Sequence, residues 1–175
     1  MLTVRRCDDV PDAGPELDVR RVGPMMSVTV TFLCIHLRGF WTHWNEGRHR
    51  TQPCTDPVES CAGHRSKLPL RWKAYAHSYD HDQHDQCLLE MTPGAARQVK
   101  RALQAHESLR GLRVKVTRGK GPKARLSVSV QKLPDPRELH KLPAEHDALI
   151  TLSKLWGFAL ENPPEFPEAD LIPTE

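Results

Sequence analysis

Residues 70–79 read Leu-Arg-Trp-Lys-Ala-Tyr-Ala-His-Ser-Tyr, and this run decides the fold class. Apolar or small side chains at every second position alternate with polar or aromatic ones, which is the period of a half-buried β-strand. We expect positions 70, 72, 74 and 76 to face a core. The opposite face of this strand is predicted to carry Arg71, Lys73, Tyr75, His77 and Tyr79.

Two further kinds of element, strands and a helix, are predicted on the C-terminal side of this run. A short strand is predicted near 86–91. A helix then starts at Thr92-Pro93, because threonine is a good N-cap and proline suits the first helical turn. Alternating valines and leucines predict two further strands at 112–116 and 125–130.

On the N-terminal side, residues 26–38 are rich in β-branched side chains and predict a long, bent first strand. The order strand, insertion, strand, strand, helix, strand, strand is that of the OB-fold, a five-stranded Greek-key barrel. We therefore expect a mainly β chain with some α-helix. The expected parts are a flexible N-terminal arm at 1–25, an OB-fold core at 26–132 with an insertion at about 40–68, a C-terminal helical segment at 133–160 and an acidic disordered tail at 161–175.

The insertion contains four nitrogen and sulfur donors, His43, Cys54, Cys61 and His64. Their spacing, H-x10-C-x6-C-x2-H, supplies two imidazoles and two thiolates, a donor set that binds tetrahedral zinc in closed structural sites. The intervening loop offers too little apolar surface to fold alone, so a structural Zn²⁺ is predicted to staple it. His49 is an alternative to His43 as the fourth ligand.

Formal charge is unevenly distributed along the chain, although the net charge is only +3. Residues 93–132 contain eleven lysines and arginines against one acid, Glu107, which is a balance of +10. Residues 161–175 contain five acidic residues and no lysine or arginine, which is a balance of −5. A basic body with an acidic tail indicates a polyanionic partner and a separate segment that recruits proteins.

Single-stranded nucleic acid requires cations for its phosphates and flat side chains for its unstacked bases, each stack contributing ~1–3 kcal/mol. The predicted strand faces and the glycine-rich loop at 118–123 offer both. Phosphate contacts are predicted for Arg71, Lys73, Arg113, Lys115, Arg118, Lys120, Lys123 and Arg125, and stacking for Tyr75, Tyr79 and Trp44. We therefore expect sequence-independent binding of single-stranded DNA without catalysis, with RNA as an open alternative.

The cysteine count and the hydropathy of the chain indicate which cellular compartment to expect. Five cysteines make an odd number that fits no disulfide framework, so a reduced, cytoplasmic compartment is expected. No apolar run approaches the roughly 18 residues that span a bilayer, so no membrane association is expected.

Two other functions remain open. A metal-dependent nuclease or transposon-type enzyme would use His77, His81 and Asp82, which lie in or beside a loop rich in histidine and aspartate. A structural zinc module would instead bind another protein. Cys34 falls in the middle of a predicted strand and is expected to be a core thiol, not a nucleophile.

The metal-ligand set inside the expected OB-fold resembles the zinc-containing single-stranded DNA-binding, helix-destabilising proteins of T-even phages. That family places a histidine, a cysteine and a closing C-x2-C pair on zinc inside an OB-fold core; here His64 stands in place of the last cysteine. The tail sequence Asp-Leu-Ile-Pro at 170–173 is similar to the acidic tips of bacterial single-stranded DNA-binding proteins. These resemblances imply partners in DNA replication, recombination or repair.

Overall fold

The computed structural model describes residues 17–45, 50–54, 61–103, 108–121 and 123–157. The chain is mainly β with a few helices, as expected from the alternating runs. Within these residues one eight-stranded sheet is formed by β1 (Asp18–Arg20), β2 (Ser27–Phe32), β3 (Arg38–Asn45), β4 (Arg50–Pro53), β5 (Leu70–Asp80), β6 (Asp85–Met91), β7 (Arg113–Arg118) and β8 (Leu126–Lys132). The helices are α1 (Ala62–Arg65), α2 (Pro93–Ala102) and α3 (Ala148–Trp156), and a 3₁₀ turn, η3, covers Leu139–Lys141. None of the described helices is long and apolar enough to cross a membrane.

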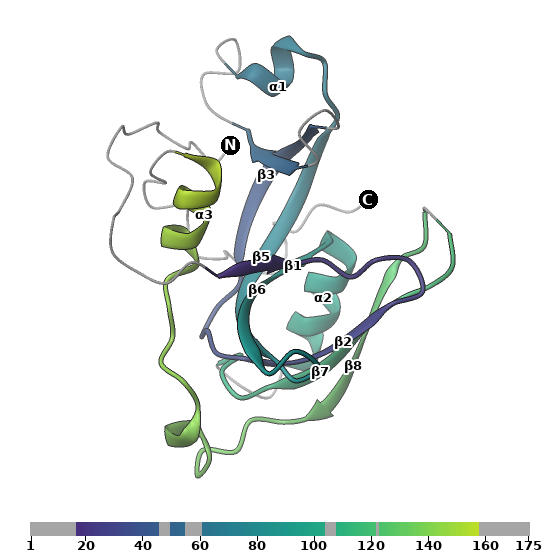
Figure 1. Cartoon of the computed structure of the whole chain (residues 1–175). Helices are drawn as coiled ribbons and strands as arrows, with labels where there is room; N and C mark the ends of the chain where they lie inside the picture. Colours follow the sequence, from purple (N-terminus) through teal and green to yellow (C-terminus); the bar gives the residue numbers. More distant parts are fainter. Residues whose placement is uncertain (1–16, 46–49, 55–60, 104–107, 122, 158–175) are drawn as a thin grey trace.

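Four strands in the centre of the sheet have a Greek-key arrangement. Their spatial order is β7-β2-β5-β6 and all three pairings are antiparallel. In a Greek key three strands follow one another and the fourth returns by a long connection to lie beside the first. Here that connection contains α2, which packs within the curve of the sheet against β8, β5 and β6 (Figure 1).

The sheet does not close, so the expected five-stranded barrel is not confirmed. β8 lies beyond β7 at one edge, and β1 pairs in parallel with β6 at the other. The expectation that residues 1–25 form a loose arm is wrong for its last third, because β1 belongs to the sheet and Val22 is buried in the core. Arg20 adds an ion pair with the buried Asp80, at 2.9 Å between Nε and Oδ2.

The long strand β5 divides the molecule into a body and an arm. Its second half pairs with β2, and its first half pairs with β3, which in turn pairs with β4. The single bent strand expected at 26–38 is thus broken: β2 ends at Phe32 and β3 begins at Arg38. The segment expected as an insertion is therefore partly sheet, and its strands form an arm that rises from the body and ends at α1 (Figure 1).

Two apolar cores hold these parts together. The larger lies inside the curved sheet around α2, whose N-cap Thr92 accepts a hydrogen bond from the Ala95 backbone N–H, as the sequence predicted. The smaller lies on the other face of β5, where Phe40 and Tyr75 pack edge-on against Trp156 of α3. Because α3 covers this second face, both faces of β5 are buried from Ala74 to Ser78, and Tyr79 beyond them is half-buried.

Candidate functional site

Four predicted metal ligands converge at the tip of the arm. His43 comes from β3, Cys54 follows β4, Cys61 is the N-cap of α1 and His64 lies within α1. One donor atom from each lies within 4.8 Å of all the others, so the group could hold a single metal ion. The alternative ligand His49 lies outside the described residues. The arm thus brings together, across two strands and a helical turn, donors that are 21 positions apart in the sequence at most.

The hydrogen bonds of His43 orient it as a ligand. Its Nδ1 donates to the Leu68 carbonyl oxygen at 3.1 Å, which leaves Nε2 to face Cys61 Sγ at 3.5 Å. A second contact, from His64 Nδ1 to Cys54 Sγ, is 3.7 Å long. A backbone carbonyl on the far nitrogen of a metal-binding histidine commonly fixes its tautomer and ring orientation. His43 and both cysteines are buried, so water has little access to three of the four donors.

Backbone hydrogen bonds hold the cluster in place. The Cys54 N–H donates to the Trp41 carbonyl at 2.8 Å, which fastens the end of β4 to β3. On the other side, the Arg65 N–H donates to Cys61 and the Leu68 N–H donates to Gly63, at 3.0 and 2.9 Å. The described part of the loop therefore holds its donors with main-chain contacts as well as side chains.

Gly63 is a residue whose role the ligand spacing did not reveal. A Cβ atom at this position would lie 2.2 Å from Cδ2 and 2.3 Å from Cγ of the His43 ring, so only glycine lets the α1 turn approach the ring. We expect Gly63→Ala to displace His43, weaken metal binding and lower the free energy of unfolding by about 1–3 kcal/mol through overpacking. Metal content and thermal unfolding measure this. Ala62→Gly, at an exposed neighbouring position, is the control; equal metal affinity in Gly63→Ala and wild type would contradict the assignment.

A buried carboxylate lies at the base of the arm. Glu90 Oε1 is 3.1 Å from Lys73 Nζ, and Oε2 is 3.1 Å from Arg21 Nε and accepts hydrogen bonds from the hydroxyls of Tyr75 and Thr51. Burial acts to raise the pKa of Glu90, but Lys73 and Arg21 outweigh it and the pKa is lowered. The network joins β4, β5 and β6 with the residue that follows β1.

Two predicted nucleic-acid contacts are corrected by this network. Tyr75 was expected to be an exposed stacking platform, but it is only 1% exposed because α3 covers its face of β5. Burial, and then the charge of Glu90, raise the pKa of its hydroxyl well above the ordinary value. Lys73 was expected to contact phosphate, but it is half-buried and forms an ion pair with Glu90. Both residues stabilise the joint between arm and body.

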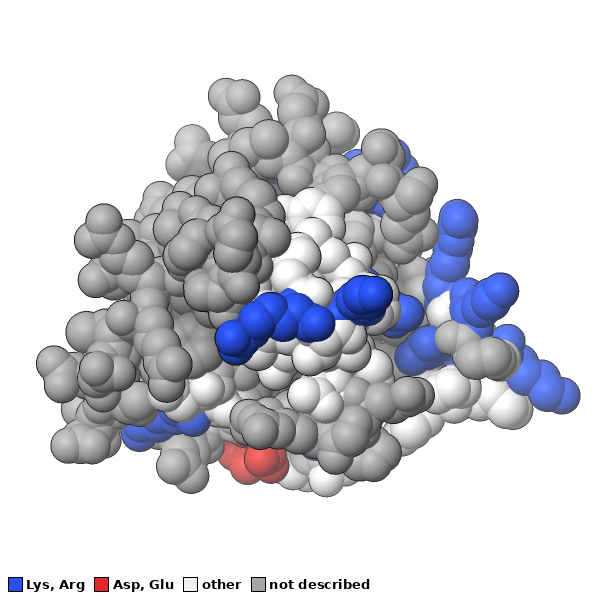
Figure 2. Space-filling view, turned by 90° about the horizontal axis from the view of Figure 1, so that it is seen from above, with Lys and Arg blue, Asp and Glu red and all other residues white. Residues whose placement is uncertain are grey.

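Other predicted contacts lie on the arm and the β7–β8 hairpin. Trp44 is half-buried with the Arg21 guanidinium 5.8 Å from its ring centroid, and Arg71 is exposed. Arg118 is half-buried, and its guanidinium donates to the carbonyls of Ala124 and Val22, so it braces the hairpin. The connection between β7 and β8 carries the exposed cations Lys120, Lys123 and Arg125. In the view from above, lysine and arginine side chains dominate the charged surface and little acidic surface is visible (Figure 2).

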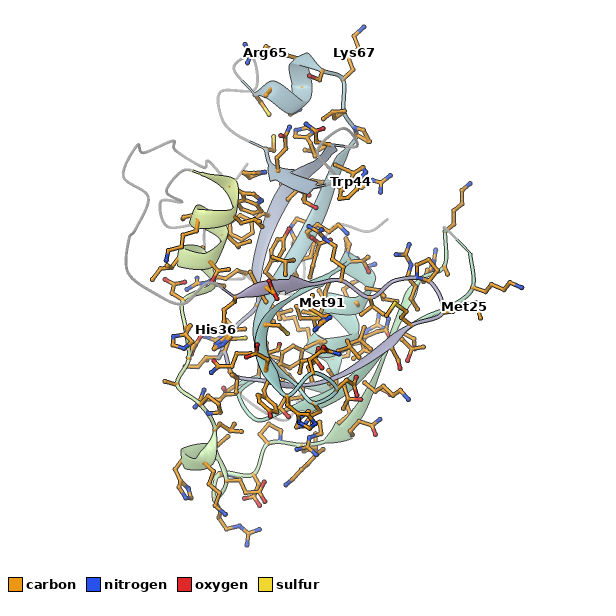
Figure 3. All side chains as sticks on the ribbon, in the orientation of Figure 1. Met25, His36, Trp44, Arg65, Lys67 and Met91 are labelled. Atoms are coloured by element: carbon orange, nitrogen blue, oxygen red, sulfur yellow. The ribbon has the colours of Figure 1, made fainter. Side chains whose placement is uncertain are left out.

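The tip of the arm is itself cationic. Arg65 at the end of α1 and Lys67 in the turn that follows it are exposed and project away from the body, whereas Trp44 lies lower on the arm (Figure 3). Neither cation was singled out from the sequence, because no periodic pattern surrounds them.

A row of side chains crosses the outer face of the sheet. The register pairs Tyr79 of β5 with Thr31 of β2, Thr31 with Arg113 of β7, and Arg113 with Lys132 of β8. Residues on one face of adjacent strands at paired positions are direct neighbours. Beyond this row the face continues with exposed polar residues, Lys115, Thr117, Ser127 and Ser129. Two predicted contacts, Tyr79 and Arg113, are thus brought together, with Lys115 beside them.

The residues of the nuclease alternative do not converge. His77 is buried, shares a hydrogen bond of 2.9 Å with Gln86 and accepts another from the His146 backbone N–H, and burial lowers its pKa to about 4. His81 instead contacts Thr31, and Asp82 accepts a hydrogen bond from the Thr29 N–H. Among the described residues, the cluster at the arm tip is the group of histidine and cysteine side chains whose donor atoms lie close enough together to share one metal ion. Cys34 is a buried free thiol, and burial raises its pKa to about 12, as expected of a core residue.

Comparisons with protein-family models, with curated proteins and with solved structures found no match to this chain.

Proposed function

We propose that the chain binds single-stranded DNA, with RNA as the alternative ligand, on the outer face of β2, β7 and β8. We also propose that a structural zinc ion stabilises the arm. The observation that carries the proposal is the cross-strand row in which Tyr79 lies beside Thr31 and Arg113, on a face of hydroxyls and cations. A flat side chain next to phosphate-binding cations is the combination that single strands require. Sequence-independent binding is part of the proposal, because the cations of this face would contact phosphates, which carry no sequence information.

The fold supports this proposal. The Greek-key quartet, β8 beside β7 and the helix α2 inside the curve are consistent with a partly open OB-like arrangement. In OB-folds, strand faces and loops bind oligonucleotides. The connection between β7 and β8 carries three exposed cations, which would extend the phosphate track along the hairpin.

The donor geometry supports zinc as the ion. With Zn–S bonds of about 2.3 Å and Zn–N bonds of about 2.0 Å, tetrahedral angles place a sulfur and a nitrogen about 3.5 Å apart. The two S···N contacts of the cluster are 3.5 and 3.7 Å. Two thiolates and two imidazoles leave no coordination position for substrate, so the role is structural. The metal would hold the arm together, and the body has its own apolar core.

The acidic residues 161–175 lie outside the described residues. Their proposed role as a tail for replication, recombination or repair proteins rests on the sequence alone.

Salt dependence tests the binding face. We expect labelled oligo(dT) to bind with a log–log salt slope of about −0.7 per neutralised phosphate, and Lys115→Gln to reduce that slope by about one phosphate. Lys154→Gln, on α3 away from the face, is the matched control and should leave the slope unchanged. Affinity independent of salt, or equal affinity for single- and double-stranded DNA of one length, would contradict the proposal.

A further inference from the structure

A cavity of about 250 Å³ lies along the polar row from Tyr79 to Lys132, between the sheet and the segment that follows β8. The sheet side is formed by Thr31, Tyr79 and Arg113, and the facing wall includes Leu139, Leu142 and Pro143. That wall segment runs from β8 through η3 toward α3 (Figure 1). The cavity therefore has an aromatic ring and an apolar wall on its sides and a guanidinium at its edge.

Hydrogen bonds on the sheet side of the cavity leave the terminal nitrogens of Arg113 available to a ligand. Arg113 Nε donates to Thr31 Oγ1 at 3.3 Å, and the same hydroxyl shares a hydrogen bond of 2.7 Å with His81 Nε2. Burial, and then the charge of Arg113, lower the pKa of His81. The two terminal nitrogens of Arg113 make no hydrogen bond within the described residues, so they can bind an anion.

Arg110 holds the wall of the cavity against the body. Its guanidinium donates to the Leu142 and Pro143 carbonyls at 3.3 and 2.7 Å, and to the Leu33 carbonyl at 2.5 Å. Arg110 does not line the cavity. It is a positioning residue that fixes the distance between the wall and Tyr79.

We propose that this cavity receives one unstacked base of the bound strand, with the base between Tyr79 and the apolar wall and its phosphate on Arg113. The inference rests on the proposed function and names the nucleotide-binding element of that face. The size favours a single base, because 250 Å³ lies just below the roughly 300 Å³ at which sites for drug-sized ligands begin. The chemistry favours a nucleotide, because the Tyr79 ring and the apolar wall lie beside the terminal nitrogens of Arg113. The two carboxylates that also line the cavity, Glu138 and Asp135, are paired with Lys132 and Arg137.

The test compares two ligands of equal phosphate count: a 12-residue oligo(dT) and a 12-residue oligonucleotide of abasic sites. We expect the wild-type protein to prefer oligo(dT), because a stacked base strengthens binding about 5- to 150-fold. Tyr79→Leu removes the ring, and Leu139→Trp fills the slot from the half-exposed wall. Each should lower the preference about tenfold while leaving affinity for the abasic strand unchanged, whereas Tyr79→Phe should keep the preference.

Arg110→Met tests the positioning role. It should lower the preference for oligo(dT) and leave both the abasic affinity and the salt slope unchanged, with partial recovery in Arg110→Lys. Equal loss for both ligands would make Arg110 a phosphate contact and overturn this role.

The two proposals fail in different ways. If neither oligonucleotide binds, the proposed function is wrong. If oligo(dT) binds and its preference over the abasic strand survives in folded Tyr79→Leu and Leu139→Trp proteins, the face binds nucleic acid but the cavity does not hold a base. Circular dichroism of each variant confirms that the comparison is between folded proteins.

Discussion

Chelation of the metal is expected to unfold the arm. The segment from β4 through α1 contributes few residues to either apolar core, so its stability depends on the four donors. Structural zinc contributes apparent binding free energies of about 10–16 kcal/mol in zinc-finger peptides, more than the whole stability of most domains. Hydrogen exchange at the Cys54, Arg65 and Leu68 amides, which are bonded within the arm, should increase on addition of a strong chelator.

Substitution of single ligands separates the metal from general loss of packing. Cys61→Ser and His64→Asn should release the ion and lower the melting temperature, and one equivalent of zinc should no longer restore it. Cys34→Ala is the matched control, because this thiol is buried but lies outside the cluster. It should lose stability through its cavity yet keep one ion per chain.

A disulfide between Cys54 and Cys61 is the competing chemistry for this cluster, since their sulfurs lie within 4.8 Å of each other. Titration of thiols in denatured, reductant-free protein, with a dye that reports released zinc, distinguishes the two. Two additional thiols and one zinc ion support the metal site. A protein with no zinc and with these two cysteines oxidised would refute it.

The clustering of the four candidate ligands was predictable because its information is local. Cysteines and histidines at short spacings are typical of zinc sites, and all four donors lie within 22 residues of the sequence. Strands β5, β6, β7 and β8 were also predictable, because alternation is a property of neighbouring residues. Gly63 was not, because its requirement arises from the ring of His43, which lies twenty positions away in sequence.

The errors share a different cause. The alternation in β5 predicts a strand with two different faces. It does not show whether the second face is exposed to water or covered by another element of the protein. That face meets α3, so Tyr75 is buried and Lys73 is engaged with Glu90. The short β1 was missed because three residues carry too little periodicity, and its place in the sheet depends on pairing with the distant β6. Arg110 was passed over as one cation among many, since its importance lies in three carbonyls contributed by distant segments.

Glu90→Gln is expected to destabilise the protein strongly, although it leaves the apolar cores intact. The side chain of Glu90 is 6% exposed, and those of its partners Lys73 and Arg21 are 21% and 38% exposed. Removing one charge from a buried pair typically costs 3–5 kcal/mol, because the remaining charge is left uncompensated. Since both cations retain some contact with water, we expect about 3 kcal/mol at pH 7, measured by urea unfolding.

The pH dependence identifies the charge as the cause. The pKa of Glu90 is lower in the folded protein than its ordinary 4.5, so its contribution is fully present above about pH 4.5 and is lost as the pH falls through the folded value. The stability difference between wild type and Glu90→Gln should therefore be constant from pH 7 to about pH 5 and shrink toward pH 3. Glu138→Gln replaces an exposed carboxylate paired with Lys132 and should produce no measurable change at either pH. A difference that persists unchanged at pH 3 would mean that Glu90 acts through shape and hydrogen bonds, and that its charge does not hold the arm to the body.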